Sequence, residues 1–158
     1  MLLKGKKIVL GVTGGIAVYK AVDLVSRLRK QGAEVRVVMT EHARQFVTPL
    51  TFKEISGNAV ATSMWNSNQE FNVEHIALAN WADVFVVAPA TANIIAKMAH
   101  GLADDLLSTT LLAAQAPIIV CPAMNTGMYE NALTQENITC LKKHGVTVMA
   151  PATGFLAC

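Results

Sequence analysis

Two short turns hold polar residues whose types and spacing could bind a small ligand. Residues 89–93 are PATAN and residues 122–129 are PAMNTGMY, and each segment follows a run of apolar residues. Small side chains let a ligand approach the backbone closely, while a hydroxyl or an amide can orient it by hydrogen bonds. A single Asn directly after a strand is more often the N-cap of a helix. Two such turns that leave strands at the same edge of a sheet nevertheless predict a binding site.

A glycine-rich loop after the first apolar run could bind a phosphate. Residues 11–17 are GVTGGIA and lead into a helical pattern, whose free N–H groups would face the ligand. The glycines match neither the dinucleotide fingerprint GxGxxG nor the phosphate loop GxxxxGK, and the second apolar run ends at Thr40 rather than at an acidic residue that would hold a ribose. Tight packing of a helix on the strand is the structural alternative for such glycines. Their place at the carboxyl end of a strand favours a mononucleotide.

Five apolar runs rich in β-branched residues predict a parallel sheet that is covered on both faces. These runs are residues 7–10, 35–39, 84–88, 118–121 and, more weakly, 146–149. Helical patterns between them cover residues 15–31, 49–56 with Thr48 as N-cap, 92–100, 104–114 and 134–144. This alternation predicts an α/β three-layer sandwich with right-handed crossovers. The polar segment 57–72 is predicted to be a surface loop.

The composition excludes several classes of function. With 53% hydrophobic and 15% charged residues, the chain is too apolar for disorder, and we expect other subunits to cover part of its surface. A net charge of +2 without a dense basic stripe argues against nucleic-acid binding. The sequence has neither an apolar run of membrane-spanning length nor a signal peptide, which favours a cytoplasmic protein without membrane attachment. The three cysteines and four histidines show no CxxC, HExxH or HxH spacing, so we expect no metal and no disulfide framework.

Together, the two turns resemble the motifs of a known family. PATAN and PAMNTGMY are similar to the PASANT and PxMNxxMW motifs of the homo-oligomeric flavin-containing cysteine decarboxylases, and GVTGGIAVYK and MAHGLADDLLSTTLLA resemble the same family. Ile94 replaces the Thr of PASANT and Tyr129 replaces the Trp of PxMNxxMW, but neither change removes a group that the chemistry requires. The resemblance covers essentially the whole chain. It implies one FMN-binding decarboxylase domain over residues 1–158, with a Rossmann-like, flavodoxin-like parallel sheet, that stops within a flap over the substrate.

The resemblance also implies where FMN binds and how the chain assembles. The family holds FMN at a subunit interface, with its phosphate near the glycine loop and the PASANT turn, which implies a homotrimer that can assemble further into a dodecamer. A phosphopantothenoylcysteine synthetase domain is the expected fused or associated partner. The implied FMN contacts are Gly14, Gly15, Ile16, Thr40, Thr91, Asn93 and Ser108 or Thr109.

Three further residues match the catalytic residues of the family. Asn125, together with Met124 and Ala123, would bind the substrate carboxylate, because an amide can donate hydrogen bonds to that group without neutralising its charge. His75 would act as a base or place the substrate, and Cys158 would donate a proton to the product. Without the resemblance, His75 would be an ordinary helix-surface histidine and Cys158 an ordinary surface thiol.

The implied reaction is the FMN-dependent decarboxylation of phosphopantothenoylcysteine to phosphopantetheine in coenzyme A biosynthesis. Flavin accepts a hydride from the carbon that bears the thiol, the resulting thioaldehyde lets CO2 leave, and reduced flavin returns the hydride to the enethiol. The alternatives are a related flavoprotein that acts on a peptidyl C-terminal cysteine or prenylates flavin, and a non-catalytic flavin-binding regulatory subunit. Cys158 argues against the peptide branch, the lack of a basic prenyl-phosphate motif argues against the prenyltransferase, and His75 with Asn125 argues against the silent subunit.

Overall fold

A parallel sheet of five strands forms the centre of the residues that the structure, a computed structural model, describes, namely 1–65 and 74–151. The strand order is β2-β1-β3-β4-β5, which is the doubly wound order of flavodoxin-like proteins. The strands are β1 (Lys7–Val12), β2 (Glu34–Met39), β3 (Val84–Ala90), β4 (Ile118–Pro122) and β5 (Thr147–Val148). All five predicted strands are confirmed. The chain changes its winding direction between β1 and β3, so a crevice is expected at the carboxyl ends of these two strands.

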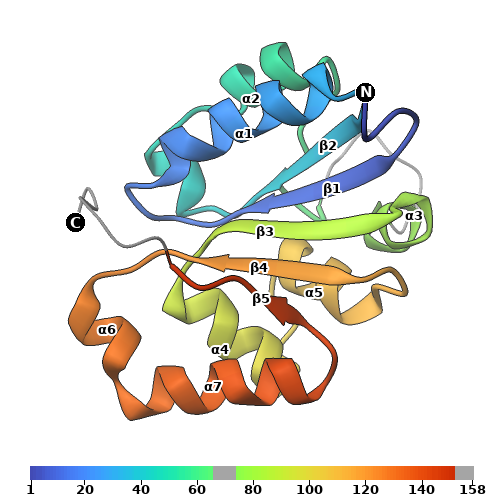
Figure 1. Cartoon of the computed structure of the whole chain (residues 1–158). Helices are drawn as coiled ribbons and strands as arrows, with labels where there is room; N and C mark the ends of the chain where they lie inside the picture. Colours follow the sequence, from blue (N-terminus) through green and yellow to red (C-terminus); the bar gives the residue numbers. More distant parts are fainter. Residues whose placement is uncertain (66–73, 152–158) are drawn as a thin grey trace.

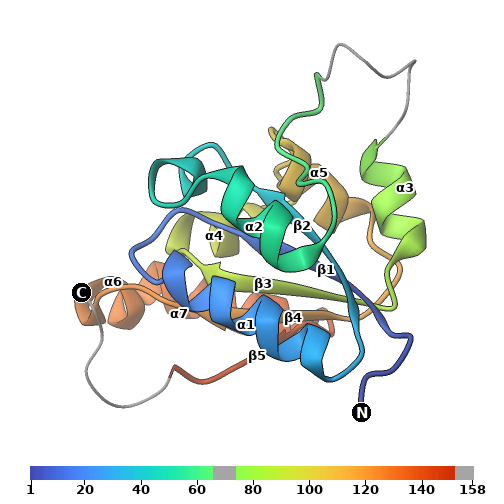
Figure 2. The same ribbon diagram turned by 90° about the horizontal axis from the view of Figure 1, so that it is seen from above.

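Helices cover both faces of the sheet (Figure 1), which confirms the predicted three-layer sandwich. Helices α1 (Val18–Lys30) and α2 (Pro49–Ser56) pack on one face, as the view from above also shows (Figure 2). The other face is covered by α3 (Glu74–Trp81), α4 (Ala92–His100), α5 (Leu106–Ala113) and α7 (Ala132–Lys143). A short 3-10 turn, η1 (Ala43–Gln45), follows β2, and a short helix, α6 (Thr126–Glu130), follows β4.

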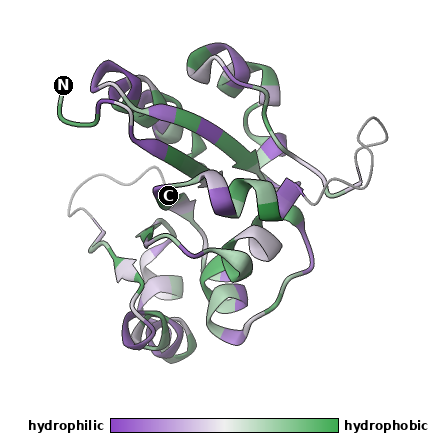
Figure 3. Ribbon diagram, turned by 90° about the vertical axis from the view of Figure 1, so that its right-hand side faces the viewer, coloured by the Kyte–Doolittle hydropathy of each residue, from purple (hydrophilic) through white to green (hydrophobic). Residues whose placement is uncertain are grey.

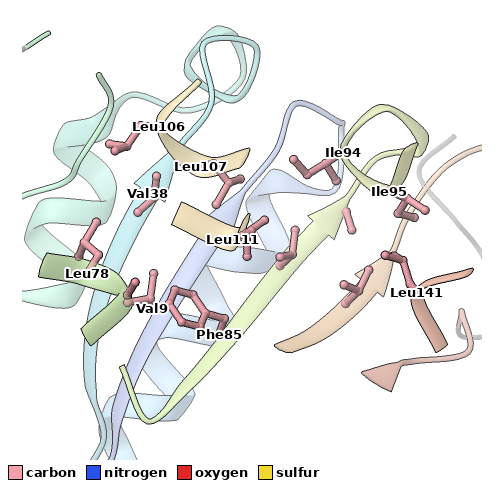
Figure 4. Close-up of a cluster of buried hydrophobic side chains, with 14 of the residues drawn as sticks. Val9, Val38, Leu78, Phe85, Ile94, Ile95, Leu106, Leu107, Leu111 and Leu141 are labelled. Carbon is pink, nitrogen blue, oxygen red and sulfur yellow. The ribbon is translucent and has the colours of Figure 1, made fainter. Parts of the chain in front are cut away.

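Two apolar clusters separate the layers because strand side chains alternate between the two faces of the sheet. Leu10 on β1 packs toward α1 and α2, where Val25 and Phe52 are fully buried. Val9 and Phe85 point to the other face, beneath α5 (Figure 4). Burying such a side chain stabilises the fold by roughly 1.5–3 kcal/mol. Figure 3 shows the matching pattern, in which the strands are mostly hydrophobic while the helices carry both kinds of residue.

Two local predictions needed correction, whereas the predicted N-cap position of Thr48 is confirmed. Segment 57–65 is largely irregular as predicted, but Ala61 is buried and bridges Val38 at the free edge of β2, while residues 66–72 lie outside the described ones. Thr48 occupies the N-cap position of α2 without a side-chain cap bond. Helix α7 begins at Ala132 rather than at residue 134, because Asn131 Oδ1 accepts a hydrogen bond from Leu133 N at 2.9 Å. Across the described segments, no helix is long and apolar enough to span a bilayer.

Candidate functional site

A cavity of about 410 Å³ opens at the carboxyl ends of β1, β2 and β3, where the winding direction changes. Its size falls in the range of small-molecule sites, and its position is the one where open α/β sheets bind ligands. Four of the predicted cofactor contacts line it: Gly14, Thr40, Thr91 and Asn93. The structure therefore brings the glycine loop, the end of β2 and the PATAN turn together around one space.

Packing explains only one of the two adjacent glycines of the first loop. A Cβ atom at Gly14 would overlap the Cβ atom of His42 and lie 2.8 Å from its carbonyl carbon, so close packing on the segment before η1 requires glycine here. A Cβ atom at Gly15 would meet only the Cγ2 atom of Thr91, at 3.9 Å. The packing interpretation thus explains Gly14, whereas the packing of the described residues gives no reason for glycine at position 15.

Helix α1 begins directly after this loop without a side-chain cap. Its N-cap residue is Ala17, which has no side-chain acceptor for the first N–H groups of the helix. The backbone bond from Val18 N to Gly15 O, at 3.0 Å, closes the first turn. The positive end of the helix dipole and the absence of a capping side chain suit an anion such as a phosphate. Ile16, which precedes Ala17, is 44% exposed and does not line the cavity.

In the PATAN turn, Thr91 rather than Asn93 caps the following helix. Thr91 Oγ1 accepts a hydrogen bond from Ile94 N at 3.2 Å, which makes Thr91 the N-cap of α4. Asn93 is the second residue of α4, and its exposed side chain lines the cavity. Thr91 therefore has the N-cap role that an Asn after a strand commonly has. Asn93 instead lines the space where a ligand would lie.

Asn125, in the second turn, does cap a helix. Its Oδ1 atom accepts a hydrogen bond from Met128 N at 2.8 Å at the start of α6. Met128 lines the cavity, so this bond places Asn125 beside it although Asn125 itself is not a lining residue. Because Oδ1 is engaged in the cap, a ligand would meet the Nδ2 donor. Met124 is buried beneath the turn and Ala123 is half-buried.

The remaining predicted residues lie elsewhere. Ser108 Oγ donates to Asp105 Oδ1 at 2.6 Å and Thr109 Oγ1 donates to Asp105 O at 2.6 Å, so both hydroxyls bond to a residue that lines the cavity without being lining residues themselves. His75 is half-buried near the start of α3 and is also not a lining residue. Cys158 lies outside the described residues.

The lining includes residues that the sequence interpretation missed. Glu41 and His42 extend the end of β2, while Lys97 and Asp105 come from α4 and the start of α5. Helical spacing could have indicated Lys97, since it lies four residues after Asn93 and so on the same face of α4. Ile94 and Met128 were also missed, as was Thr13 inside the glycine loop, which is only 2% exposed.

An ion pair lies beside the cavity. Lys97 Nζ lies 2.8 Å from Asp104 Oδ1, which joins α4 to the segment that leads into α5. The hydrogen bond from Lys97 holds the pKa of Asp104 below its usual value of 3.8. Burial raises the pKa of Glu74, next to His75, and that of the Cys121 thiol at the end of β4. The part of the chain that the structure describes holds no cluster of three or more His, Cys, Asp or Glu residues arranged to bind a metal ion.

Comparisons with known proteins give this geometry a context. The family described as Flavoprotein matches residues 2–158. The chain is 52% identical over 158 residues to the Coenzyme A biosynthesis bifunctional protein CoaBC of Haemophilus influenzae, and it spans 40% of the length of that protein.

Two solved structures show the same fold at moderate identity. The FMN-dependent cysteine decarboxylase SpaF superposes with a TM-score of 0.86 at 35% identity, covering 94% of this chain and 85% of SpaF. A PPC decarboxylase mutant complexed with pantothenoylaminoethenethiol superposes with a TM-score of 0.82 at 32% identity, covering 98% of this chain and 86% of the mutant.

Proposed function

Because this chain belongs to the Flavoprotein family, we propose that it binds FMN in the cavity at the ends of β1 and β3 and decarboxylates phosphopantothenoylcysteine. The observation that carries the proposal is the cavity itself, which joins Thr13 and Gly14 of the glycine loop to Thr91 and Asn93 of the PATAN turn. The relatives support the substrate, since the bifunctional CoaBC protein is assigned to coenzyme A biosynthesis and a PPC decarboxylase has the same fold.

The residues around the cavity fit FMN. The positive end of the α1 dipole suits its phosphate, and a ligand can approach the backbone at Gly15, where a Cβ atom would meet only Thr91 Cγ2 at 3.9 Å. Thr40, Thr91 and Asn93 offer hydroxyl and amide groups along the cavity. Bound FMN would supply a two-electron acceptor and donor that amino-acid side chains lack.

The substrate would lie on the α6 side of the cavity. There the Asn125 amide donates to the substrate carboxylate, while Met124 and Ala123 shape the turn that holds it. An amide orients a carboxylate without neutralising it, so the carboxylate stays ionised and can leave as neutral CO2 while the electron pair of the broken bond passes into the enethiolate. Cys158 keeps its predicted role as the donor of the last proton.

His75 is the reason to propose that the site is completed by a second copy of the chain. His75 is on α3, and the cavity lining follows the other end of β3. Exposed apolar side chains adjoin it, since Ile76 is 41% exposed and Leu112 on the neighbouring α5 is 62% exposed. A homotrimer that buries these residues would bring His75 of one subunit to the cavity of the next. A synthetase domain is the proposed further partner, since the CoaBC relatives are bifunctional.

The proposal is tested by purifying the protein and recording its visible absorption with and without added FMN. We expect a yellow protein that releases CO2 from phosphopantothenoylcysteine and not from a peptide that ends in cysteine. A protein that stays colourless with excess FMN contradicts every flavin reaction, whereas turnover of the peptide alone would favour the peptidyl-cysteine branch. Cys158→Ser should still release CO2 but accumulate the enethiol, and a normal aminothiol yield would refute the role of Cys158.

A further inference from the structure

The hydroxyl of Thr13 joins the two turns that form the cavity. Thr13 is the first residue after β1, and its side chain is 2% exposed. Its Oγ1 atom donates a hydrogen bond to Pro89 O at 2.5 Å and accepts one from Thr91 N at 3.1 Å. One side chain thereby uses both its donor and its acceptor to link the glycine loop to the PATAN turn.

This link begins where the regular pairing of the two strands ends. The last paired residues of β1 and β3 are Gly11 and Val87. Beyond them Pro89 has no N–H group to donate, and the backbone bond from Thr13 N to Pro89 O is long, at 3.4 Å. The Thr13 hydroxyl therefore replaces the backbone hydrogen bonds between β1 and β3 at the point where these two segments separate, one toward α1 and the other toward α4.

Thr13 affects the geometry of the site through its hydrogen bond with Thr91. Thr13 Oγ1 holds the backbone N–H of Thr91, whose own hydroxyl caps α4. That cap sets the first turn of α4, which carries Asn93 into the cavity. On the other side, Gly14 and Gly15 follow Thr13 directly in the chain. The glycine loop and the PATAN turn are thus linked by the buried hydroxyl of Thr13 together with the long backbone bond from Thr13 N to Pro89 O.

We propose that Thr13 is a positioning residue that sets the width of the cofactor cavity and hence the affinity for FMN. The inference rests on the proposed function, since FMN is the ligand that the two turns would hold between them. Thr13 does not act in the reaction itself, because its hydrogen-bonding groups are already engaged within the protein.

The test compares Thr13→Val, which keeps the shape of the side chain and removes both hydrogen bonds, with Thr13→Ser, which keeps the hydroxyl. The dissociation constant for FMN is measured by flavin fluorescence, and the visible spectrum and apoprotein Tm are recorded alongside. Losing two hydrogen bonds and leaving Thr91 N–H without its partner should weaken FMN binding by about tenfold or more and shift the flavin spectrum. Thr13→Ser should stay within about threefold of the wild type.

Two controls separate positioning from simple loss of stability. Thr110→Val removes another buried hydroxyl, one that bonds only to Leu106 O within α5 at 2.6 Å, and should leave FMN affinity unchanged. Phe85→Leu makes a cavity in the core at the far end of β3 and should lower Tm without changing the flavin spectrum. Should Thr13→Val fail to fold, the nearly isosteric pair Thr13→Ser and Thr13→Cys gives the same comparison, because a thiol is a weak hydrogen-bonding group.

Equal FMN affinity and spectra in Thr13→Val and the wild type would overturn the inference. So would a Phe85→Leu variant that weakens FMN binding as much as Thr13→Val does at the same loss of Tm. If the wild type itself fails to bind FMN, the proposed function fails first, and the comparison of variants is not reached.

Discussion

Lys97 and Asp104 form an ion pair of 2.8 Å between α4 and the segment that precedes α5. Lys97 also lines the cavity, so the pair connects a possible ligand contact to the packing of two helices. The pair lies next to Asp105, whose carboxylate caps α5 by accepting from Ser108 N at 2.8 Å. Polar contacts thus join α4 to the start of α5 beside the cavity.

The ion pair predicts that the stability of the folded protein depends on pH. Because Lys97 lowers the pKa of Asp104 below 3.8 in the folded state, the stabilisation is present above pH 3.8 and is lost as the pH falls through the lowered pKa. Lys97→Met should return the pKa of Asp104 toward 3.8, as measured by an NMR titration of its side-chain carboxyl carbon. An unchanged pKa in this variant would show that the ion pair does not form in solution.

The adjacent glycines should respond differently to the same substitution. Gly14→Ala should destabilise the protein by about 1–3 kcal/mol, because the new methyl group would overlap His42. Gly15→Ala should change stability by less than about 0.5 kcal/mol, because it meets only Thr91 at 3.9 Å, yet it should weaken FMN binding. Urea unfolding of the apoprotein and an FMN titration measure the two effects, and the idea fails if Gly15→Ala binds FMN normally.

Thr91 and Asn93 form a second matched pair. Thr91→Ala removes the N-cap of α4 and should cost about 1 kcal/mol of stability in addition to weakening FMN binding. Asn93→Ala should weaken FMN binding at nearly unchanged stability, because the Asn93 side chain lies in the cavity and is not the cap. Thermal unfolding without FMN distinguishes the two variants, and a large loss of Tm in Asn93→Ala would argue for a structural role instead.

Asn125 allows its cap to be separated from its proposed contact with the substrate. Asn125→Asp keeps an oxygen that can accept from Met128 N, and a negative charge at the start of a helix is favourable. The same charge would repel the substrate carboxylate, so we expect an unchanged Tm, normal FMN binding and loss of CO2 release. Asn125→Ala should lose both the cap and the activity. Full activity in Asn125→Asp would exclude the carboxylate contact.

The sequence predicted those parts of the molecule that depend on local patterns. Val84 to Ala88 and the other apolar runs are strands covered on both faces, so periodicity and length were sufficient. Thr40 and Thr91 were found because they stand at strand ends, a position that the order of elements alone determines.

The rest of the site depends on contacts between distant segments. Gly14 and Gly15 are alike in sequence, and only the approach of His42 distinguishes them. The partners of Thr13 are 76 and 78 residues away, so its bridging role required the register of β1 against β3. The hydroxyl of Ser108 serves the capping box of α5, which depends on Asp105 three residues earlier, and its contact with FMN stays a prediction. The proposed role of His75 rests on the proposed assembly, and local sequence patterns do not encode the contacts between subunits.

The interior position of β1, between β2 and β3 in the sheet, has a consequence for synthesis on the ribosome. β1 and β2 are neighbours both in sequence and in the sheet, whereas the other edge of β1 pairs with β3, whose first residue is Val84. Chains emerge from the N-terminus at about 5–20 residues per second, so this edge stays without its partner for several seconds. An unpaired strand edge is a place where other chains can associate. Arrested nascent chains that end before β3 should therefore bind chaperones and be cleaved by proteases more readily than chains that extend past α4. The pairing of β1 with the distant strand β3 creates the ligand crevice in the finished protein. The same pairing makes the nascent chain depend on cellular quality control.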